Sequence, residues 1–265
     1  MSLMSIKINY FYTNLSNMKK LLTLSLLVVF INQLSFSQMI LNRDFSLYFE
    51  ENGTEFSSAL SGGINSGQFS NIDLNLDGIM DLIVFDKSGN KLIPFINDNG
   101  TYKYEPKYRE NFPEIHDWAI LADYNCDGKN DIFTYSSAGM AVYLNTSITS
   151  LSFSVVDTLV RSDYGGAIPL NIFISPVDIP AITDIDFDGD LDVLTFSILG
   201  GFIEYHKNLS MELYGNCDSL KFEFSESCWG LFYEGLNSYI LDCVNCQCPQ
   251  ITSNNTENTK EKHAG

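Results

Sequence analysis

The chain has 265 residues, of which 45% are hydrophobic and 18% charged, and this balance excludes a disordered protein and predicts a folded one. Its 33 acidic and 15 basic residues give a net charge of −18, which argues against nucleic acid or an anionic membrane surface as a partner and favours multivalent cations. Aromatic residues make up 13%, and 18 glycines accompany only 7 prolines. We therefore expect a β-rich protein with many turns rather than a coiled coil or a collagen-like rod.

The first 37 residues have the pattern of a secretory signal peptide. A pair of lysines precedes an apolar stretch over residues 21–31, and the small residues at 35–37 predict cleavage before Gln38. A membrane anchor is the weaker alternative, because a membrane-spanning helix needs about 20 apolar residues. We expect a product that is secreted or lies at the cell surface, with Met18 as an alternative to Met1 for the start.

Three acidic segments repeat along the chain in the same register. Each has Asp at its first position, Asp or Asn at the third, Asp at the fifth, Gly at the sixth and Asp at the ninth. They form a first loop at residues 73–81, a second at 123–131 and a third at 184–192. A run of β-type residues follows each loop, and a Gly stands eight residues after each last Asp, namely Gly89, Gly139 and Gly200. Each unit therefore predicts a loop, a strand, a turn and a second strand.

Alternating oxygen donors in a tight loop are typical of a site for a hard cation. Calcium takes six to eight oxygens, and Gly permits the sharp turn that such a loop needs. We predict up to three Ca²⁺ ions, bound by side chains at positions one, three, five and nine and by the backbone carbonyl at position seven. The predicted ligands are Asp73, Asn75, Asp77, Ile79 and Asp81; Asp123, Asn125, Asp127, Lys129 and Asp131; and Asp184, Asp186, Asp188, Asp190 and Asp192. The third loop has the most acidic side-chain ligands and is expected to bind most tightly.

Two other interpretations of these loops compete with this one. An EF-hand needs a bidentate Glu at the twelfth position and a helix on each side. The twelfth residues here are Val84, Thr134 and Thr195, and the flanking residues alternate as strands do. Solvated acidic turns without metal are the second alternative, but carboxylates clustered in three aligned loops would repel one another without a cation.

At these residues the sequence resembles the FG-GAP/VCBS repeat family, the calcium-loop β-propeller blades of integrin α-subunit N-termini and of many exported bacterial proteins. The resemblance covers about residues 45–208, and residues 118–123 look like the strand that opens a blade. It implies an all-β fold with three recognisable four-stranded antiparallel blades that form a partial propeller. The lysine-rich start and the abundant Asn and Tyr resemble an exported protein of the Bacteroidetes group.

The predicted organisation has three parts. A signal peptide occupies residues 1–37, FG-GAP/VCBS repeats occupy residues 38–210, and a Cys-rich partial blade or insertion with a polar tail occupies residues 211–265. Closed propellers have about four to eight blades. We therefore expect the gene product to be truncated, with further blades of a longer chain or self-association to cover the apolar faces of an open arc.

Five of the six cysteines lie near the C-terminal end: Cys217, Cys228, Cys243, Cys246 and Cys248. In an exported protein this clustering favours disulfide bonds over a zinc site. The disulfide pairing stays undetermined. These five cysteines are an odd number, so one of them is free, pairs with Cys126 or pairs with sequence beyond the chain. Cys126 itself, within the second loop, is expected to pack as a small hydrophobic residue.

Catalytic motifs are scarce. The three histidines, His116, His206 and His263, are scattered, and no known nucleophile or metalloprotease motif is present. We expect a non-catalytic interaction or adhesion module with a protein or glycan ligand. The alternative is a part of a carbohydrate-active enzyme, of the propeller polysaccharide lyase type, whose catalytic residues lie outside this chain. Asn145 and Asn208 begin two of the formal glycosylation sequons, which carry little weight in a bacterial host.

Overall fold

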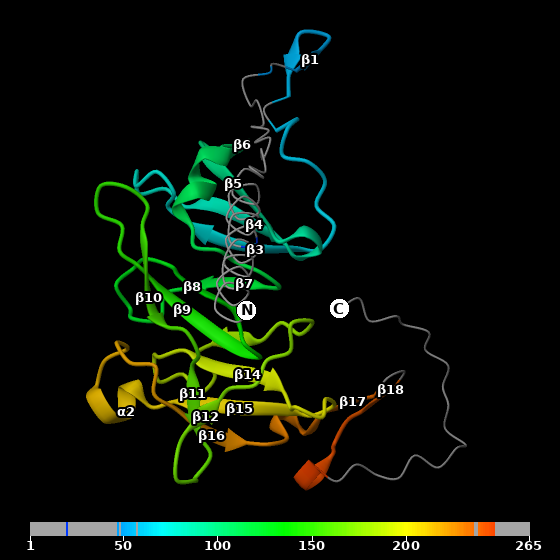
Figure 1. Cartoon of the computed structure of the whole chain (residues 1–265), viewed down its shortest axis with the longest axis vertical. Helices are drawn as coiled ribbons and strands as arrows, with labels where there is room; N and C mark the ends of the chain where they lie inside the picture. Colours follow the sequence, from blue (N-terminus) through cyan, green and yellow to red (C-terminus); the bar gives the residue numbers. More distant parts are fainter. Residues whose placement is uncertain (1–19, 21–46, 48, 57, 236–237, 247–265) are drawn as a thin grey trace, which may run out of the picture. The chain divides into compact units, whose positions relative to one another are not determined.

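The structure is a computed structural model that describes residues 20, 47, 49–56, 58–235 and 238–246 (Figure 1). The chain divides into two compact units, residues 1–46 and 47–265, and every element described below lies in the second unit. The predicted signal peptide and its cleavage site lie outside the described residues, apart from Lys20. Over the part of the chain that the structure describes, no helix is long and apolar enough to span a membrane.

The first two sheets each contain four antiparallel strands in chain order. The first sheet consists of β3 (Gly67–Ile72), β4 (Asp81–Asp86), β5 (Lys91–Asp98) and β6 (Thr101–Tyr104). The second consists of β7 (Ala119–Ala122), β8 (Asp131–Ser136), β9 (Gly139–Asn145) and β10 (Phe153–Asp157). Their central strands are rich in β-branched and aromatic residues, which suit a pleated surface. The expected all-β fold with blade-like sheets is confirmed.

The third sheet has the same four antiparallel strands and two more at its edge. The four are β13 (Ala181–Thr183), β14 (Asp192–Phe196), β15 (Ile203–Asn208) and β16 (Phe222–Glu226). The added pair is β11 (Arg161–Asp163) and β12 (Leu170–Asn171), and β11 runs parallel to β16. The third sheet therefore differs from the expected four-stranded blade. The added pair lies between the second and third loops, which explains their wider separation in the sequence.

Short elements complete the described part of the chain. Helix α2 (Ser210–Tyr214) stands between β15 and β16. Two hairpins, β1 (Glu50–Glu51) with β2 (Thr54–Glu55) and β17 (Tyr233–Gly235) with β18 (Ser238–Ile240), form separate two-stranded sheets. The 3₁₀ helices are η1 (Lys87–Gly89), η2 (Pro106–Asn111), η3 (Trp229–Leu231) and η4 (Val244–Cys246). The helix content is thus small, as the composition predicts.

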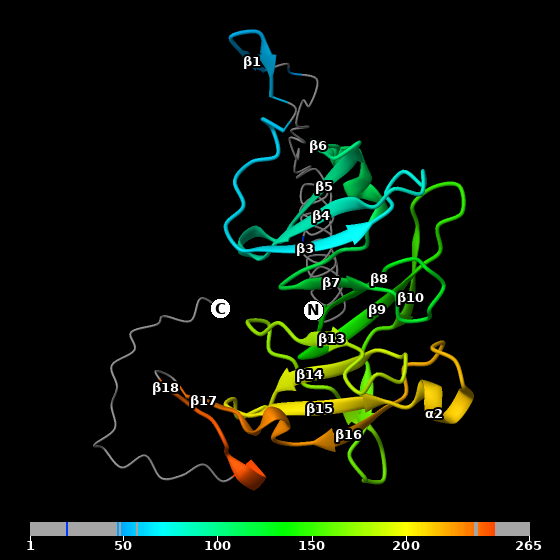
Figure 2. The same ribbon diagram turned by 180° about the vertical axis from the view of Figure 1, so that it is seen from behind.

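The core of the second unit lies on both faces of the second sheet. Ile132 of β8 packs in a buried cluster with Ile83 and Phe85 of β4. The next residue, Phe133, points to the opposite face and packs in another cluster with Val193 of β14. Since successive residues of a strand face opposite sides, a sheet covered on both sides needs a continuous apolar run. The three sheets are therefore joined through their faces, and Figures 1 and 2 show the second between the other two.

A tight turn fixes the register of the central hairpin of the second sheet. Ser136 pairs with Gly139, and the two residues between them, Ser137 and Ala138, both have a positive φ, as in a type I′ turn. A side chain on Gly139 would meet a backbone oxygen, that of Ile172, at 3.0 Å. This close approach explains Gly at this position of the second sheet.

Candidate metal sites

The three acidic loops have the same backbone hydrogen bonds, and each connects two strands. In the second loop, Oδ1 of Asp123 accepts the N–H of Asp127 at 3.1 Å and Oδ2 accepts the N–H of Gly128 at 2.8 Å. The first Asp of each other loop accepts from the same two positions. The fifth Asp then accepts the N–H of the seventh residue in every loop. The loops are therefore three copies of one structure, and the strands beside them exclude an EF-hand.

The fourth and sixth residues of each loop have a left-handed backbone. The sixth is Gly, with φ between 84° and 106° in the three loops. The fourth is Leu76, Cys126 or Phe187, with φ of 61°, 60° and 65°. This conformation is uncommon for residues other than Gly, Asn and Asp. It lets the loop curl so that the side chains at positions one, three and five lie on its inner side.

The expectation that Cys126 packs as a small hydrophobic residue is wrong. Cys126 is exposed at the tip of the second loop and forms a disulfide with Cys217. Its left-handed backbone directs the side chain outward, as for Phe187, which is 89% exposed. Of the alternatives left open for the odd cysteine, pairing with Cys126 is the one found. Cys228 pairs with Cys246, and Cys243 is disulfide-bonded too.

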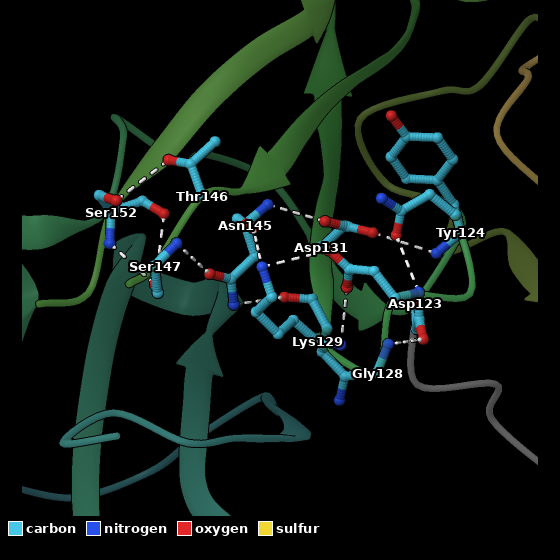
Figure 3. A network of polar contacts seen from close by, with 12 residues as sticks. Asp123, Tyr124, Gly128, Lys129, Asp131, Asn145, Thr146, Ser147 and Ser152 are labelled. Carbon is cyan, nitrogen blue, oxygen red and sulfur yellow. Dashed lines mark hydrogen bonds and ion pairs between the residues drawn. The ribbon is translucent and has the colours of Figure 1, made fainter. Parts of the chain in front are cut away.

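The last Asp of each loop is completely buried and bridges the loop to a strand. Figure 3 shows this arrangement for Asp131 in the second loop. Oδ2 of Asp131 accepts the N–H of Tyr124 at 3.1 Å, and Oδ1 accepts the N–H of Asn145, at the end of β9, at 2.7 Å. Asp81 makes the same two bonds to Leu74 and Asn97, and Asp192 makes them to Ile185 and Asn208. We call this pair of bonds the aspartate bridge. It fixes the start of each loop to the third strand of its sheet.

Burial changes the proton affinity of the bridging carboxyls. Burial raises the pKa of Asp131 to about 6, although the N–H groups of Asn145 and Tyr124 act in the opposite direction. Burial raises the pKa of Asp81 and Asp192 as well. The neighbouring carboxylates of each loop add to this effect in all three cases. These loops thus have a surplus of negative charge that a cation would relieve.

We expect Asp131→Ala to lower the free energy of unfolding by about 3 kcal/mol in the presence of a chelator. The substitution removes two hydrogen bonds to a charged group and leaves two backbone N–H groups without an acceptor. Urea denaturation measures the effect, and Asp127→Ala, which removes an exposed carboxylate from the same loop, is the matched control with an expected loss below about 1 kcal/mol. An equal loss of unfolding free energy in the two variants would show that the aspartate bridge does not contribute to stability.

Carboxylate oxygens converge most closely in the third loop. Asp184, Asp186 and Asp188 each offer one oxygen, and these three oxygens lie within 4.8 Å of one another. The ammonium group of Lys207 on β15 pairs with Asp186 and lies 3.6 Å from Oδ2 of Asp188. Hydrogen bonds to Asp186 and to Glu212 raise the pKa of Lys207, so this side chain is charged. The ninth residue, Asp192, lies in its aspartate bridge, where the hydroxyl of Tyr205 also donates to it.

The first and second loops have Asn at the third position and therefore fewer charges. In the first loop, Asp73 is half-buried, whereas Asn75 and Asp77 are exposed and hydrogen-bonded to each other. In the second loop, Nζ of Lys129 lies 3.2 Å from Oδ2 of Asp127. Ile79 occupies the position of Lys129 in the first loop, and its side chain is 45% exposed.

Each loop places its predicted ligands in the same arrangement. The half-buried first aspartates are Asp73, Asp123 and Asp184; the third residues are Asn75, Asn125 and Asp186; the fifth are Asp77, Asp127 and Asp188; the seventh are Ile79, Lys129 and Asp190; and the buried ninth are Asp81, Asp131 and Asp192. Positions one and five are linked by backbone hydrogen bonds within the loop, whereas position nine is linked to a strand.

Three asparagines near the ends of strands support the loops although they lie outside the acidic motif. Asn97, Asn145 and Asn208 donate their backbone N–H to the bridging Asp. Asn145 and Asn208 are the last residues of β9 and β15, and Asn97 is the next-to-last residue of β5. Asn145 and Asn208 are almost fully buried, at 3% and 1% exposure. Their side-chain amides bond to backbone carbonyls, so neither is an accessible glycosylation site in this fold. The recurrence of Asn at the same place in all three repeats was the available signal.

A comparison with protein-family models finds one similarity, which covers the first two loops. Residues 73–134, which contain the first two loops, match the model of an FG-GAP-like repeat. This segment is similar to an FG-GAP repeat. The predicted resemblance to the FG-GAP family is therefore confirmed there. The third loop lies outside the match, and its residues at positions one, five and nine accept the same hydrogen bonds as those of the two matched loops. No curated protein matches the chain.

Proposed function

We propose that the chain is an exported calcium-binding protein whose β-propeller-type repeats act as a non-catalytic interaction or adhesion module at the cell surface or outside the cell. The observation that carries this proposal is the hydrogen-bond framework that three acidic loops share, two of them within the segment that matches an FG-GAP-like repeat. The same oxygen donors recur in three loops, and binding of a hard cation explains this recurrence best.

The donors of the third loop fit calcium. Asp184, Asp186 and Asp188 supply converging carboxylate oxygens. Oδ2 of Asp188 is buried and accepts no hydrogen bond from the described residues, and its nearest cationic group is the ammonium of Lys207 at 3.6 Å. A buried carboxylate oxygen without a donor is costly unless a cation compensates it. The corresponding residues of the first two loops would hold the other ions, with an amide oxygen at position three. The ion would neutralise the loop and tie together the strands on each side of it.

The disulfides support export. Cys126 pairs with Cys217 and Cys228 pairs with Cys246. Disulfides persist in oxidising compartments outside the cytosol and are rare inside it. This chemistry agrees with the signal-peptide pattern of the sequence.

The surroundings of two histidines support a non-catalytic role. His206 is completely buried and packs against the rings of Tyr164 and Phe224. His116 is exposed, and its Nδ1 lies 2.5 Å from Oδ2 of Asp117. A general acid or base must reach a substrate and be held by a partner beside it. His206 is not accessible to a substrate, and the pairing of His116 with an adjacent residue at the surface is an ordinary surface contact.

The interaction function is tested by binding of the full-length protein to arrays of immobilised glycans and proteins. We expect binding to one class of ligand in the presence of calcium and its loss when a chelator is added, since ion binding would order the loops. The same protein is incubated with acidic polysaccharides, and the release of unsaturated products is measured. Product release in place of stable binding would contradict the proposal and favour a polysaccharide lyase.

A further inference from the structure

The acidic side chains of the third repeat extend beyond its loop. Position seven is Asp190, where the first loop has Ile79 and the second has Lys129. Helix α2, which follows β15, adds Glu212 in its first turn. The carboxylates that gather in this repeat are Asp184, Asp186, Asp188, Asp190, Asp192 and Glu212. The first two loops each have acidic side chains only at positions one, five and nine.

Asp190 is a buried carboxylate that is only half satisfied. The residue is 1% exposed, and its Oδ2 accepts the N–H of Met211 in α2 at 2.8 Å. Its Oδ1 is buried and accepts no hydrogen bond from the described residues. Burial of an acceptor without a donor costs free energy, and for a charged group the cost is larger. A compensating cation close to Oδ1 would remove this cost.

Two other carboxylates converge with Asp190. One oxygen from each of Asp188, Asp190 and Glu212 lies within 4.8 Å of the other two. Glu212 is exposed, so this group opens to solvent on one side, while Asp190 closes it on the other. Three converging carboxylate oxygens with an open side suit a divalent cation that completes its coordination with water.

We propose that Asp188, Asp190 and Glu212 form an additional divalent-cation site, which joins the third loop to helix α2. It goes beyond the proposed function, because none of the three loop sites requires Glu212. It is specific to the third repeat, because only this repeat has an acidic residue at position seven and a helix after its third strand.

Lys207 lies between the two groups of carboxylates. Its ammonium group pairs with Asp186 of the loop group and with Glu212 of the additional group. A single positive charge offsets only a small part of the negative charge gathered there. One ion in the loop, a second at the additional site and Lys207 between them would leave the repeat close to neutral. As a third cation Lys207 would repel both ions, and the surplus of carboxylates around them would offset this repulsion.

The number of bound ions tests this site. Equilibrium dialysis of the full-length protein against Ca²⁺ at pH 7.5 gives the number of ions bound per chain. We expect Glu212→Gln and Asp190→Asn each to bind one ion fewer than the wild type. In the second variant the side-chain amide oxygen can still accept the Met211 N–H, so the cap of α2 is retained. Glu223→Gln, which changes an exposed glutamate of β16 outside the group, should bind the wild-type number.

The outcomes separate this proposal from that of the loop sites. A wild-type ion count in both Glu212→Gln and Asp190→Asn overturns the additional site. If Asp127→Ala loses an ion while these two variants do not, only the additional site fails. If these two lose an ion and Asp127→Ala does not, the additional site stands and the assignment of the second loop fails. A wild-type protein that takes up no ion contradicts both.

Discussion

Adding calcium to the chelated protein is expected to raise its thermal midpoint by about 5–10 °C for each loop that is saturated. A ligand that binds only the folded state at 100 times its dissociation constant stabilises it by about 2.7 kcal/mol. In a domain of this size, each kcal/mol moves the midpoint by about 2–4 °C. The physical cause lies in the loops, where burial and neighbouring carboxylates raise the pKa of Asp81, Asp131 and Asp192. Scanning calorimetry in chelator and in calcium measures the difference.

Single substitutions assign this effect to the loops. Asp77→Ala and Asp127→Ala each remove the fifth-position carboxylate of one loop, and each should lower the number of bound ions by one and reduce the rise in midpoint accordingly. Asp188→Ala removes a carboxylate that the third loop shares with the additional site, so it should lower the number of bound ions by two. Magnesium at the same concentration is a control for ionic strength, because it dehydrates reluctantly and demands a stricter geometry. A midpoint that stays the same after complete removal of calcium would contradict the proposed function.

The sequence was sufficient to predict the loops and the strands beside them. Both depend on local patterns: the spacing of acidic residues and Gly in the loop, and the β-branched and aromatic runs that begin at Asp81, Asp131 and Asp192. A loop of nine residues with a fixed turn brings the same atoms together wherever it occurs. For this reason the internal hydrogen bonds are alike in all three copies.

The aspartate bridge could not be predicted from the spacing alone. Its second donor is the backbone N–H of Asn97, Asn145 or Asn208, which stands in the sequence beyond a complete hairpin. Which backbone N–H reaches a buried carboxylate depends on the register of that hairpin, and register is a property of the folded sheet. The additional group of the third repeat escaped prediction for a similar reason, since Glu212 meets Asp190 only because α2 folds back after β15.

The added strands of the third sheet could not be predicted from the sequence pattern either. β11 and β12 are short, and β11 pairs in parallel with β16, a strand far along the chain. Such a pairing leaves no periodic signal in a segment of two or three residues. The wide separation of the second and third loops indicated only that an insertion was present.

Loss of the disulfide between Cys126 and Cys217 is expected to lower the free energy of unfolding by about 4–5 kcal/mol. The bond joins the tip of the second loop to the segment after α2, across a sequence separation of 91 residues. A cross-link that closes a long loop restricts the unfolded chain, and the chain-entropy relation gives about 4.6 kcal/mol for this length. Cys126 is exposed, so its replacement by Ser leaves no cavity there, and the effect of Cys126→Ser with Cys217→Ser reports mainly on the cross-link.

The disulfide between Cys228 and Cys246 provides the matched comparison. It closes a separation of only 18 residues, for which the same relation gives about 3 kcal/mol. Urea denaturation of the two double-Ser variants in saturating calcium should therefore rank the Cys126–Cys217 variant as the less stable. Because Cys126 lies within the second loop, its variant should also bind the ion of that loop more weakly, whereas the Cys228–Cys246 variant should keep the wild-type affinity. The reverse ranking, with an unchanged affinity in both, would show that the long cross-link neither restricts the unfolded chain nor holds the second loop in place.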